Sequence, residues 1–344
     1  MADPRFYDRL GPRTITEIAA LSDAAISDSG AGETTVDAVA PLGEASRGAV
    51  SYVESAKLLA AAEAADLDDA VILAPEALKD ALVERGAIVL VHAAPRAGFA
   101  AIAASLFRPR RIAGPEAIDQ SAKIAPDAVI APNAVIGPDV EIGAGAWIGP
   151  GAHIGPGCRI GEGSVIGANA SISCSDIGRE CQILAGAVLG EAGFGVAVAG
   201  STVIDIPHLG MVRLGDRVTI GANSCVDRAV FGETRLDDGV KLDNLCHIAH
   251  NVRVGRSVLM PAYAGVSGST TIGDGVMFGG RVGISDHVEI GEGARIGSNS
   301  AVMNDVPAGE TYAGAPAQPI RRHMREIAEI RRLVKSKDKS KKGG

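Results

Sequence analysis

The sequence predicts a parallel β-helix, preceded by a small α/β domain and followed by a C-terminal helix. Apolar residues recur at every sixth position: ten isoleucines run from Ile118 to Ile172, and twelve apolar residues run from Leu236 to Val302. A period of six fits neither the 3.6-residue helix nor the two-residue alternation of a strand. A short fixed repeat of this kind is typical of a β-helix in which each hexad forms one strand and one corner.

Small residues and turn formers support the same interpretation. Four residues after each inward isoleucine the chain places a small side chain, as at Ala122, Ala128 and Ala134, because the interior is narrow. Three hexads make a triangular coil of 18 residues, and coils stacked at ~4.8 Å would form a rod roughly 45 Å long. Glycine and proline suit the corners. Such pairs occur at Gly137-Pro138, Gly149-Pro150 and Gly155-Pro156.

Composition narrows the function classes. Aromatic side chains are scarce at 3% and glycine reaches 44 residues, as thin coils require, while the net charge of −8 argues against a nucleic-acid-binding protein. The five cysteines lack CxxC spacing, so we expect buried thiols in a reducing cytoplasm and no metal site. We expect no signal peptide because the start is polar and charged, and no apolar run reaches the ~20 residues that span a bilayer. We therefore expect a cytoplasmic protein without stable membrane insertion.

Residues 1–112 lack the hexad period and are expected to form an α/β domain. Thr14 can cap a helix, and Pro stands at the start of two others. Gly86 stands where a C-terminal cap would close the first of these two. The expected helices cover Ile15–Leu21, Pro75–Arg85 and Pro95–Phe107, and the expected strands cover Ala70–Leu73 and Ala87–Val91.

The C-terminal segment, 318–344, follows a β-helix domain expected over 113–317, which Pro316 and Pro319 close. One face of its predicted helix is apolar. From Arg321 onward ten Lys or Arg oppose three acids, a net +7, so the remainder of the chain carries −15. The last ten residues, KSKDKSKKGG, are expected to be disordered. The apolar face comprises Ile320, Met324, Ile327, Ile330 and Val334.

A loop at 190–213 interrupts the hexads. Long loops that leave a regular scaffold usually carry function. Its Gly193-Phe194-Gly195 segment would place backbone and one ring, that of Phe194, against a ligand. The alternative is a packing flap with no chemical role.

Two histidines mark the candidate site. His250 stands near a corner of the coil, and His287 follows 37 residues later, two coils and one residue on, so both fall on nearly the same edge. Asp243 precedes His250 by seven residues and is expected to orient its imidazole around one corner. The other histidines have no such support and are interpreted as structural or solvated: His92, His153, His208, His247 and His323.

One coil beyond His250 lies Gly268. Its backbone N–H would stand beside the imidazole, where a tetrahedral oxyanion needs a donor during acyl transfer. The alternative is an ordinary corner glycine, since only its position relative to His250 distinguishes it.

These segments carry a family resemblance. The stretch from FGVAVAGSTVIDIPHLG to CVDRA, followed by LDNLCHIAHNVRVG, resembles the UDP-3-O-acylglucosamine N-acyltransferases of lipid A biosynthesis over nearly the whole chain. The resemblance implies a left-handed β-helix, a homotrimer with an acyl groove between subunits, and transfer of an (R)-3-hydroxyacyl chain to the 2-amine of a UDP-3-acylglucosamine. The donor would be the 4′-phosphopantetheine thioester of acyl carrier protein, with no other cofactor and no metal.

The resemblance also implies residue roles. His250 matches the catalytic base, His287 the second active-site histidine and Gly268 the oxyanion amide, while Asn244 and Asn251 of the same motif are expected to contact substrate. The mechanism would be direct attack without an acyl-enzyme, since no cysteine is placed as a nucleophile.

The uracil motif of the family is altered here. Tyr52 and Lys57 persist as expected substrate contacts, but Ser55 and Leu58 replace the usual Asn and Tyr. An acceptor with a 3-amino group in place of the 3-hydroxyl is therefore one possibility.

Acyl carrier proteins are acidic, so the +7 C-terminal segment is a plausible docking surface for one. The alternative is that this charge belongs to a solvated helix end that aids solubility. Two rivals stay open: an acetyl-CoA-dependent nucleotide-sugar N-acetyltransferase, and an inactive scaffold.

Overall fold

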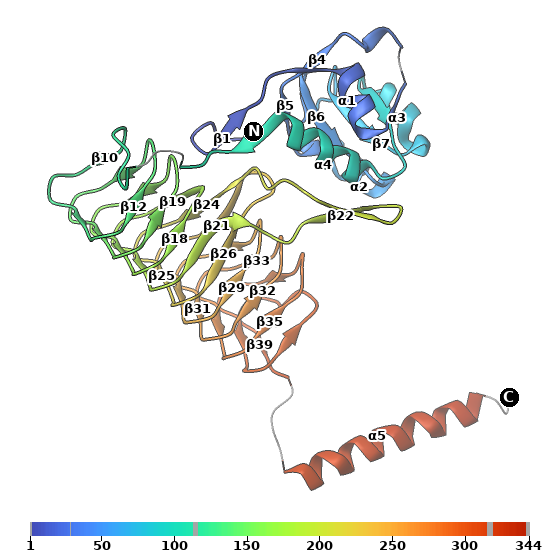
Figure 1. Cartoon of the computed structure of the whole chain (residues 1–344). Helices are drawn as coiled ribbons and strands as arrows, with labels where there is room; N and C mark the ends of the chain where they lie inside the picture. Colours follow the sequence, from blue (N-terminus) through green and yellow to red (C-terminus); the bar gives the residue numbers. More distant parts are fainter. Residues whose placement is uncertain (1, 28, 113–115, 315–318, 342–344) are drawn as a thin grey trace.

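The computed structural model describes residues 2–27, 29–112, 116–314 and 319–341. A small α/β unit lies against the upper part of a tapering solenoid, and a long helix, α5 (Ile320–Lys341), stands beyond the last coil (Figure 1). The fold class predicted from the hexad period is confirmed: the solenoid is a parallel β-helix.

The N-terminal unit is built on a five-stranded sheet of order β3-β8-β7-β6-β5. The Thr14 side chain caps α1 and Glu17 completes a capping box, as the sequence predicts for the cap. The helix predicted after Pro75 begins as a 3₁₀ turn, η3 (Glu76–Leu78), before α3. The remaining bounds are β3 (Ala25–Ile26), β5 (Ala38–Val39), β6 (Ala49–Tyr52), β7 (Val71–Ala74), β8 (Ile88–Val91), α1 (Ile15–Ser22), α3 (Lys79–Val83) and α4 (Pro95–Leu106).

Several elements of this unit were not predicted from the sequence, among them β3, β5, β6 and the short helix α2 (Ala56–Ala61). Strand β6 pairs in parallel with β7, and α2 follows it with Ser55 as N-cap. Ser55 Oγ accepts the backbone N–H of Leu58. Ser55, one of the two residues that depart from the family's uracil motif, therefore acts as a helix cap here.

The solenoid has three sheets, of nine, ten and nine strands. Successive strands pair in parallel 18 residues apart, except at the insertion, in its neighbouring coils and in the last coil. Two sheets run from β10 (Lys123–Ile124) to β36 (Glu289–Ile290) and from β11 (Val129–Ile130) to β39 (Thr311–Tyr312). The third, here named the site sheet, comprises β12 (Val135–Ile136), β15 (His153–Ile154), β18 (Ser171–Ile172), β21 (Val188–Ala192), β26 (Cys225–Arg228), β29 (His247–Ile248), β32 (Gly265–Val266), β35 (Gly283–Ile284) and β38 (Ala301–Val302).

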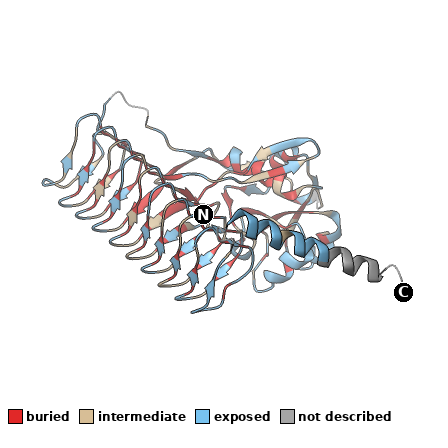
Figure 2. Ribbon diagram, turned by 90° about the horizontal axis from the view of Figure 1, so that it is seen from below, coloured by how far each residue is buried: buried red, intermediate tan, exposed pale blue. Residues whose placement is uncertain are grey.

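Most of the hexad residues are buried, and Figure 2 shows red, buried segments in the coils of the solenoid. Ile148, Ile248 and Ile290 are fully buried, and the small positions such as Ala146 are buried beside them. Burial of this continuous apolar column stabilises the stack, because no coil can cover its own inner face alone.

The insertion is an antiparallel hairpin, β22 (Val196–Ala199) and β23 (Thr202–Asp205). Its Ala197 and Ile206 pack against Ala97 and Ala100 of α4, which joins the hairpin to the N-terminal unit. Arg228 holds the base of the hairpin: its Nε donates to the His208 carbonyl at 2.9 Å and its Nη1 to the Gly190 carbonyl at 2.8 Å. The loop is thus a fixed wall between two units.

Helix α5 differs from the sequence expectation at its end. Residues 335–341, expected to be disordered, form its last turns, and 342–344 lie outside the described residues, as does Pro316. Lysine is a good helix former and nothing before Lys341 breaks the helix. Ile320, Met324 and Ile330 are exposed in the isolated chain.

All five cysteines are free thiols. Burial raises the pKa of Cys158, Cys174, Cys181, Cys225 and Cys246. A raised pKa makes a thiol a poor nucleophile, which suits the interpretation of these cysteines as packing residues.

Candidate active site

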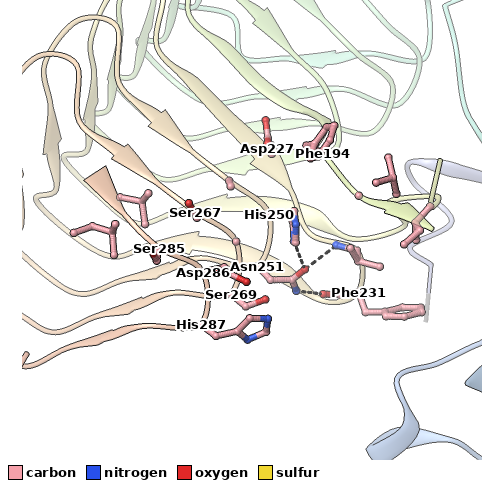
Figure 3. Close-up of a pocket in the computed structure, with 18 of the residues that line it drawn as sticks. Phe194, Asp227, Phe231, His250, Asn251, Ser267, Ser269, Ser285, Asp286 and His287 are labelled. Carbon is pink, nitrogen blue, oxygen red and sulfur yellow. Dashed lines mark hydrogen bonds between the residues drawn. The ribbon is translucent and has the colours of Figure 1, made fainter. Parts of the chain in front are cut away.

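A cleft of about 1220 Å³ lies where the site sheet, the hairpin and the N-terminal unit meet. The site sheet contributes the corner residues after β29, β32 and β35, which Figure 3 draws as neighbouring sticks. The hairpin contributes Phe194 and Val196, and the N-terminal unit contributes Tyr52, Leu58 and Arg96.

His250 stands at the corner after β29, between two glycines. A Cβ atom on Gly268 would lie 2.6 Å from His250 Cε1, and one on Gly193 would lie 3.1 Å from His250 Cδ2. Any side chain at either position would therefore displace the ring, so the two glycines make the space that the imidazole occupies.

Asn251 sets the tautomer of His250. The Asn251 amide is oriented by its own bonds, since Nδ2 donates to the Phe231 carbonyl at 2.8 Å and Oδ1 accepts the Val230 N–H at 2.9 Å. Oδ1 also lies 3.4 Å from His250 Nδ1, so Nδ1 carries the proton (Figure 3). This leaves Nε2 with a free electron pair, the form that a general base requires.

Gly268 and His287 stand on the same corner as His250. The Ser269 N–H donates to the His250 carbonyl and the His287 N–H donates to the Gly268 carbonyl, at 3.0 and 3.1 Å. Asn251, Ser269 and His287 have φ of 59°, 60° and 56°, the left-handed conformation that closes this corner in successive coils. The stacking premise of the sequence analysis is thus met: both imidazoles and the glycine line one cleft.

Asp243 and Asn244 lie elsewhere, and the prediction that Asp243 orients His250 is wrong. Asp243 accepts the N–H groups of Asn244 and Ala262, at 2.7 and 3.2 Å, and the Asn244 side chain accepts the Ala222 N–H at 2.7 Å. Both follow β28 (Lys241–Leu242) of the ten-stranded sheet, so they occupy the corner before β29 rather than the one after it. Their bonds hold backbone turns, and neither residue lines the cleft.

Of the other residues expected to contact substrate, Tyr52 and Phe194 line the cleft and Lys57 does not. Tyr52 lines the cleft, packs on Phe99 with ring centroids 5.0 Å apart and lies under the Arg96 guanidinium. Phe194 also lines it and is 87% exposed, so its ring is available to a ligand. Lys57 is exposed on α2 and does not line the cleft in the isolated chain.

Several cleft residues were missed from the sequence. Asp227 and His247 face the cleft from β26 and β29, and Asp286 occupies the corner position one coil beyond Gly268. Only the 18-residue stacking rule could have found Asp286. Ser51 and Arg96 carry buried polar atoms, Oγ and Nε, without a hydrogen-bond partner in the described chain, and both line the cleft.

His208, interpreted from the sequence as structural or solvated, is almost fully buried beneath the hairpin. Its ring meets that of His250 edge to face, with centroids 5.2 Å apart, and Nδ1 lies 2.9 Å from the Ile206 carbonyl. Burial lowers the pKa of His208 to about 4. A neutral ring therefore forms the floor behind the candidate base.

The repeat region matches two family profiles, described as "Bacterial transferase hexapeptide (six repeats)" over 139–174 and 269–304, and "Hexapeptide repeat of succinyl-transferase" over 159–191 and 211–256. A protein of Maricaulis maris named UDP-3-O-acylglucosamine N-acyltransferase is 59% identical over 344 residues, all of both chains. The chain belongs to the UDP-3-O-acylglucosamine N-acyltransferase family.

A second member of this N-acyltransferase family, from Caulobacter vibrioides, is 50% identical over 97% of this chain and 98% of its own. Among solved structures, LpxA from Acinetobacter baumannii is 27% identical, with a TM-score of 0.41 over 59% of this chain and 73% of that one.

Two further findings concern metal ligands and membrane-spanning helices. Over the residues that the structure describes, no three His, Cys, Asp or Glu side chains are grouped as metal ligands. Within the same ranges no helix has both the length and the apolar character needed to cross a bilayer.

Proposed function

We propose that this chain transfers an (R)-3-hydroxyacyl group from the phosphopantetheine thioester of acyl carrier protein to the 2-amine of a UDP-3-acylglucosamine, in lipid A biosynthesis in the cytoplasm. The observation that carries this proposal is the His250 imidazole, with its Nε2 lone pair free, resting against Gly268 in a cleft walled by the hairpin and the N-terminal unit.

The step needs one base and one oxyanion donor. The amine nitrogen attacks the thioester carbonyl, and His250 Nε2 accepts a proton from this nitrogen. The carbonyl oxygen becomes an oxyanion next to the Gly268 N–H, for which the described chain holds no acceptor. An amide of this kind contributes about 3 kcal/mol at a comparable site. The tetrahedral intermediate then collapses, the C–S bond breaks, and the thiolate takes the proton from His250.

The N-terminal wall suits a nucleotide. Tyr52 offers a ring face, Arg96 a cation and Ser51 a buried hydroxyl without a partner, all at the cleft. Burial raises the pKa of Tyr52, so its hydroxyl stays protonated as a donor. Leu58, which replaces the family's Tyr, leaves an apolar contact where an aromatic stack would otherwise form.

We propose a homotrimer on the basis of an apolar surface on the ten-stranded sheet and its corner. Leu259 of β31 (Leu259–Met260) stacks on Met277 of β34 (Met277–Phe278), and Leu245 and Tyr263 extend the surface around the corner. All four side chains are 39–54% exposed in the isolated chain. A contiguous exposed apolar surface of this kind marks an interaction site.

Acyl carrier protein is proposed as donor because α5 concentrates positive charge on a negatively charged chain. Arginines and lysines dominate α5, and the segment from Arg321 onward carries +7 against −15 elsewhere. Complementary charge of this kind accelerates encounter with an acidic partner.

The test supplies the purified chain with UDP-3-acylglucosamine and either 3-hydroxyacyl acyl carrier protein or acetyl-CoA, and identifies products by mass. We expect turnover with the protein-bound donor. Turnover with acetyl-CoA alone would favour the acetyltransferase rival, and turnover with neither would favour an inactive scaffold.

A further inference from the structure

Asp227 is a buried carboxylate with no hydrogen bond to the residues that the structure describes. It follows Val226 at the end of β26 and is 9% exposed, and its one close polar contact among the described residues is His247 Nε2, 3.5 Å from Oδ2. Burying a carboxylate without donors is costly unless a cation pairs with it. The carboxylate lines the cleft, so the missing partner can come from a ligand.

Asp227 lies at the reactive edge of His250. A Cβ atom on Gly193 would lie 2.9 Å from Asp227 Oδ2 and 3.1 Å from His250 Cδ2. Cδ2 is bonded to Nε2 within the imidazole ring, so the Asp227 carboxylate and this edge of the ring meet at the same glycine. Both groups line the cleft, where one bound acceptor can contact them together.

Five titratable or charged groups surround this carboxylate. His247 and His250 face it from β29 and the following corner, and His208 Nε2 approaches from the hairpin, 3.2 Å from the same Gly193 position. Arg228 is its chain neighbour, but its guanidinium donates to two hairpin carbonyls, while Glu191 adds negative charge. Burial raises the pKa of Asp227, and the histidines and Arg228 oppose that rise.

We propose that Asp227 binds the acceptor as its ammonium ion and removes the first of the two protons that N-acylation must release. This inference rests on the proposed function. An amino sugar is largely an ammonium ion near neutral pH, and an ammonium nitrogen has no lone pair with which to attack. A hydroxyl acceptor would need one proton acceptor, whereas an ammonium acceptor needs two.

The protons balance as follows. The ammonium gives one proton to the Asp227 carboxylate, which passes it to His247 Nε2, and the half-exposed His247 ring releases it to water. The neutral amine then attacks the thioester carbonyl and gives its second proton to His250. His250 gives that proton to the departing thiolate, so Asp227 and His250 both return to their starting protonation states.

The kinetic test compares wild type with Asp227→Asn from pH 6.5 to 9. We expect kcat/KM of the variant to fall about 100-fold at pH 6.5 but about tenfold or less at pH 9, because the variant depends on the neutral amine, whose fraction rises about tenfold per pH unit below the amine pKa. A loss that is constant across this range would show a merely structural role and overturn the proposal. His247→Gln should reproduce the slope with a smaller loss.

A binding test separates this inference from the proposed function and does not depend on a folded variant. Calorimetry at pH 6.5 compares wild-type affinity for UDP-3-acylglucosamine with affinity for its 2-N-acetyl counterpart, which carries no ammonium. We expect about tenfold tighter binding of the amine, declining towards pH 9. Equal affinity at both pH values would overturn the role of Asp227 even if the chain were an active transferase. If the protein binds the amine more tightly but transfers no acyl group from any donor, the proposed function is rejected and the ammonium site is kept.

Discussion

The corner that carries His250 and the corner that carries Asp243 belong to one nine-residue motif, yet they are built for different purposes. At the His250 corner, Gly193 and Gly268 leave room for a ring and the hairpin covers it. At the Asp243 corner, the Asp243 carboxylate and the Asn244 side-chain oxygen accept hydrogen bonds from backbone N–H groups. Seven residues along the chain cross a whole face of the prism, whereas eighteen residues return to the same corner.

The largest effect is expected from removing the base. His250→Ala should lower kcat about 10³-fold, equivalent to about 4 kcal/mol, because the His250 imidazole is the group nearest to Gly268. Steady-state assay with acyl carrier protein thioester measures it, with the melting temperature as a folding control. A loss of less than about tenfold would show that the chemistry does not belong to this corner.

A matched pair of glycines sharpens the comparison of the corners. Gly268→Ala should lower kcat by about 10²–10³-fold, since its Cβ would lie 2.6 Å from the His250 ring and displace it from the oxyanion amide. Gly280 occupies the equivalent corner position after β34, where a Cβ would meet nothing closer than the Ala262 carbonyl oxygen at 3.8 Å. Gly280→Ala should therefore be nearly silent, and equal losses for both variants would refute the difference between the corners.

The burial of His208 beneath the hairpin predicts that the stability of the protein depends on pH. Burial lowers the pKa of His208 to about 4, so below its unfolded pKa of about 6.5 the unfolded chain binds a proton that the folded chain rejects. Stability is thus lost as pH falls from about 6.5 to about 4. The wild type should lose about 3 kcal/mol more than His208→Gln over that window in urea unfolding. Parallel pH profiles for the two proteins would contradict this account.

The smallest effect is expected at the other corner. Asp243→Ala removes an acceptor for two backbone N–H groups and should cost about 1 kcal/mol of stability, read as a fall of a few degrees in melting temperature. Its kcat should stay far above that of His250→Ala in the same assay. A loss of kcat as large as that of His250→Ala would restore the orienting role that the structure denies to Asp243.

The sequence predicted the solenoid and the cleft histidines for one reason: a strict period converts sequence distance into spatial position. Ile124 and Ile142 pair because they are 18 residues apart, and Gly268 lies under His250 for the same reason. The prediction for Asp243 failed because it used proximity along the chain, where the coil turns a corner. Strand β6 and helix α2 were missed because short segments of ordinary composition carry no such period.

The hexad repeat by itself determined the coil, the inward apolar column and the corner shared by His250, Gly268 and His287, since a repeating local geometry leaves stacking no other register. Only the tertiary structure decided which groups meet that corner from outside. The hairpin interrupts the period, and its packing on α4 brings His208 and Gly193 against His250, with Gly193 also close to Asp227 of β26. Contacts between non-repeating segments depend on side-chain packing in three dimensions, which no spacing rule encodes.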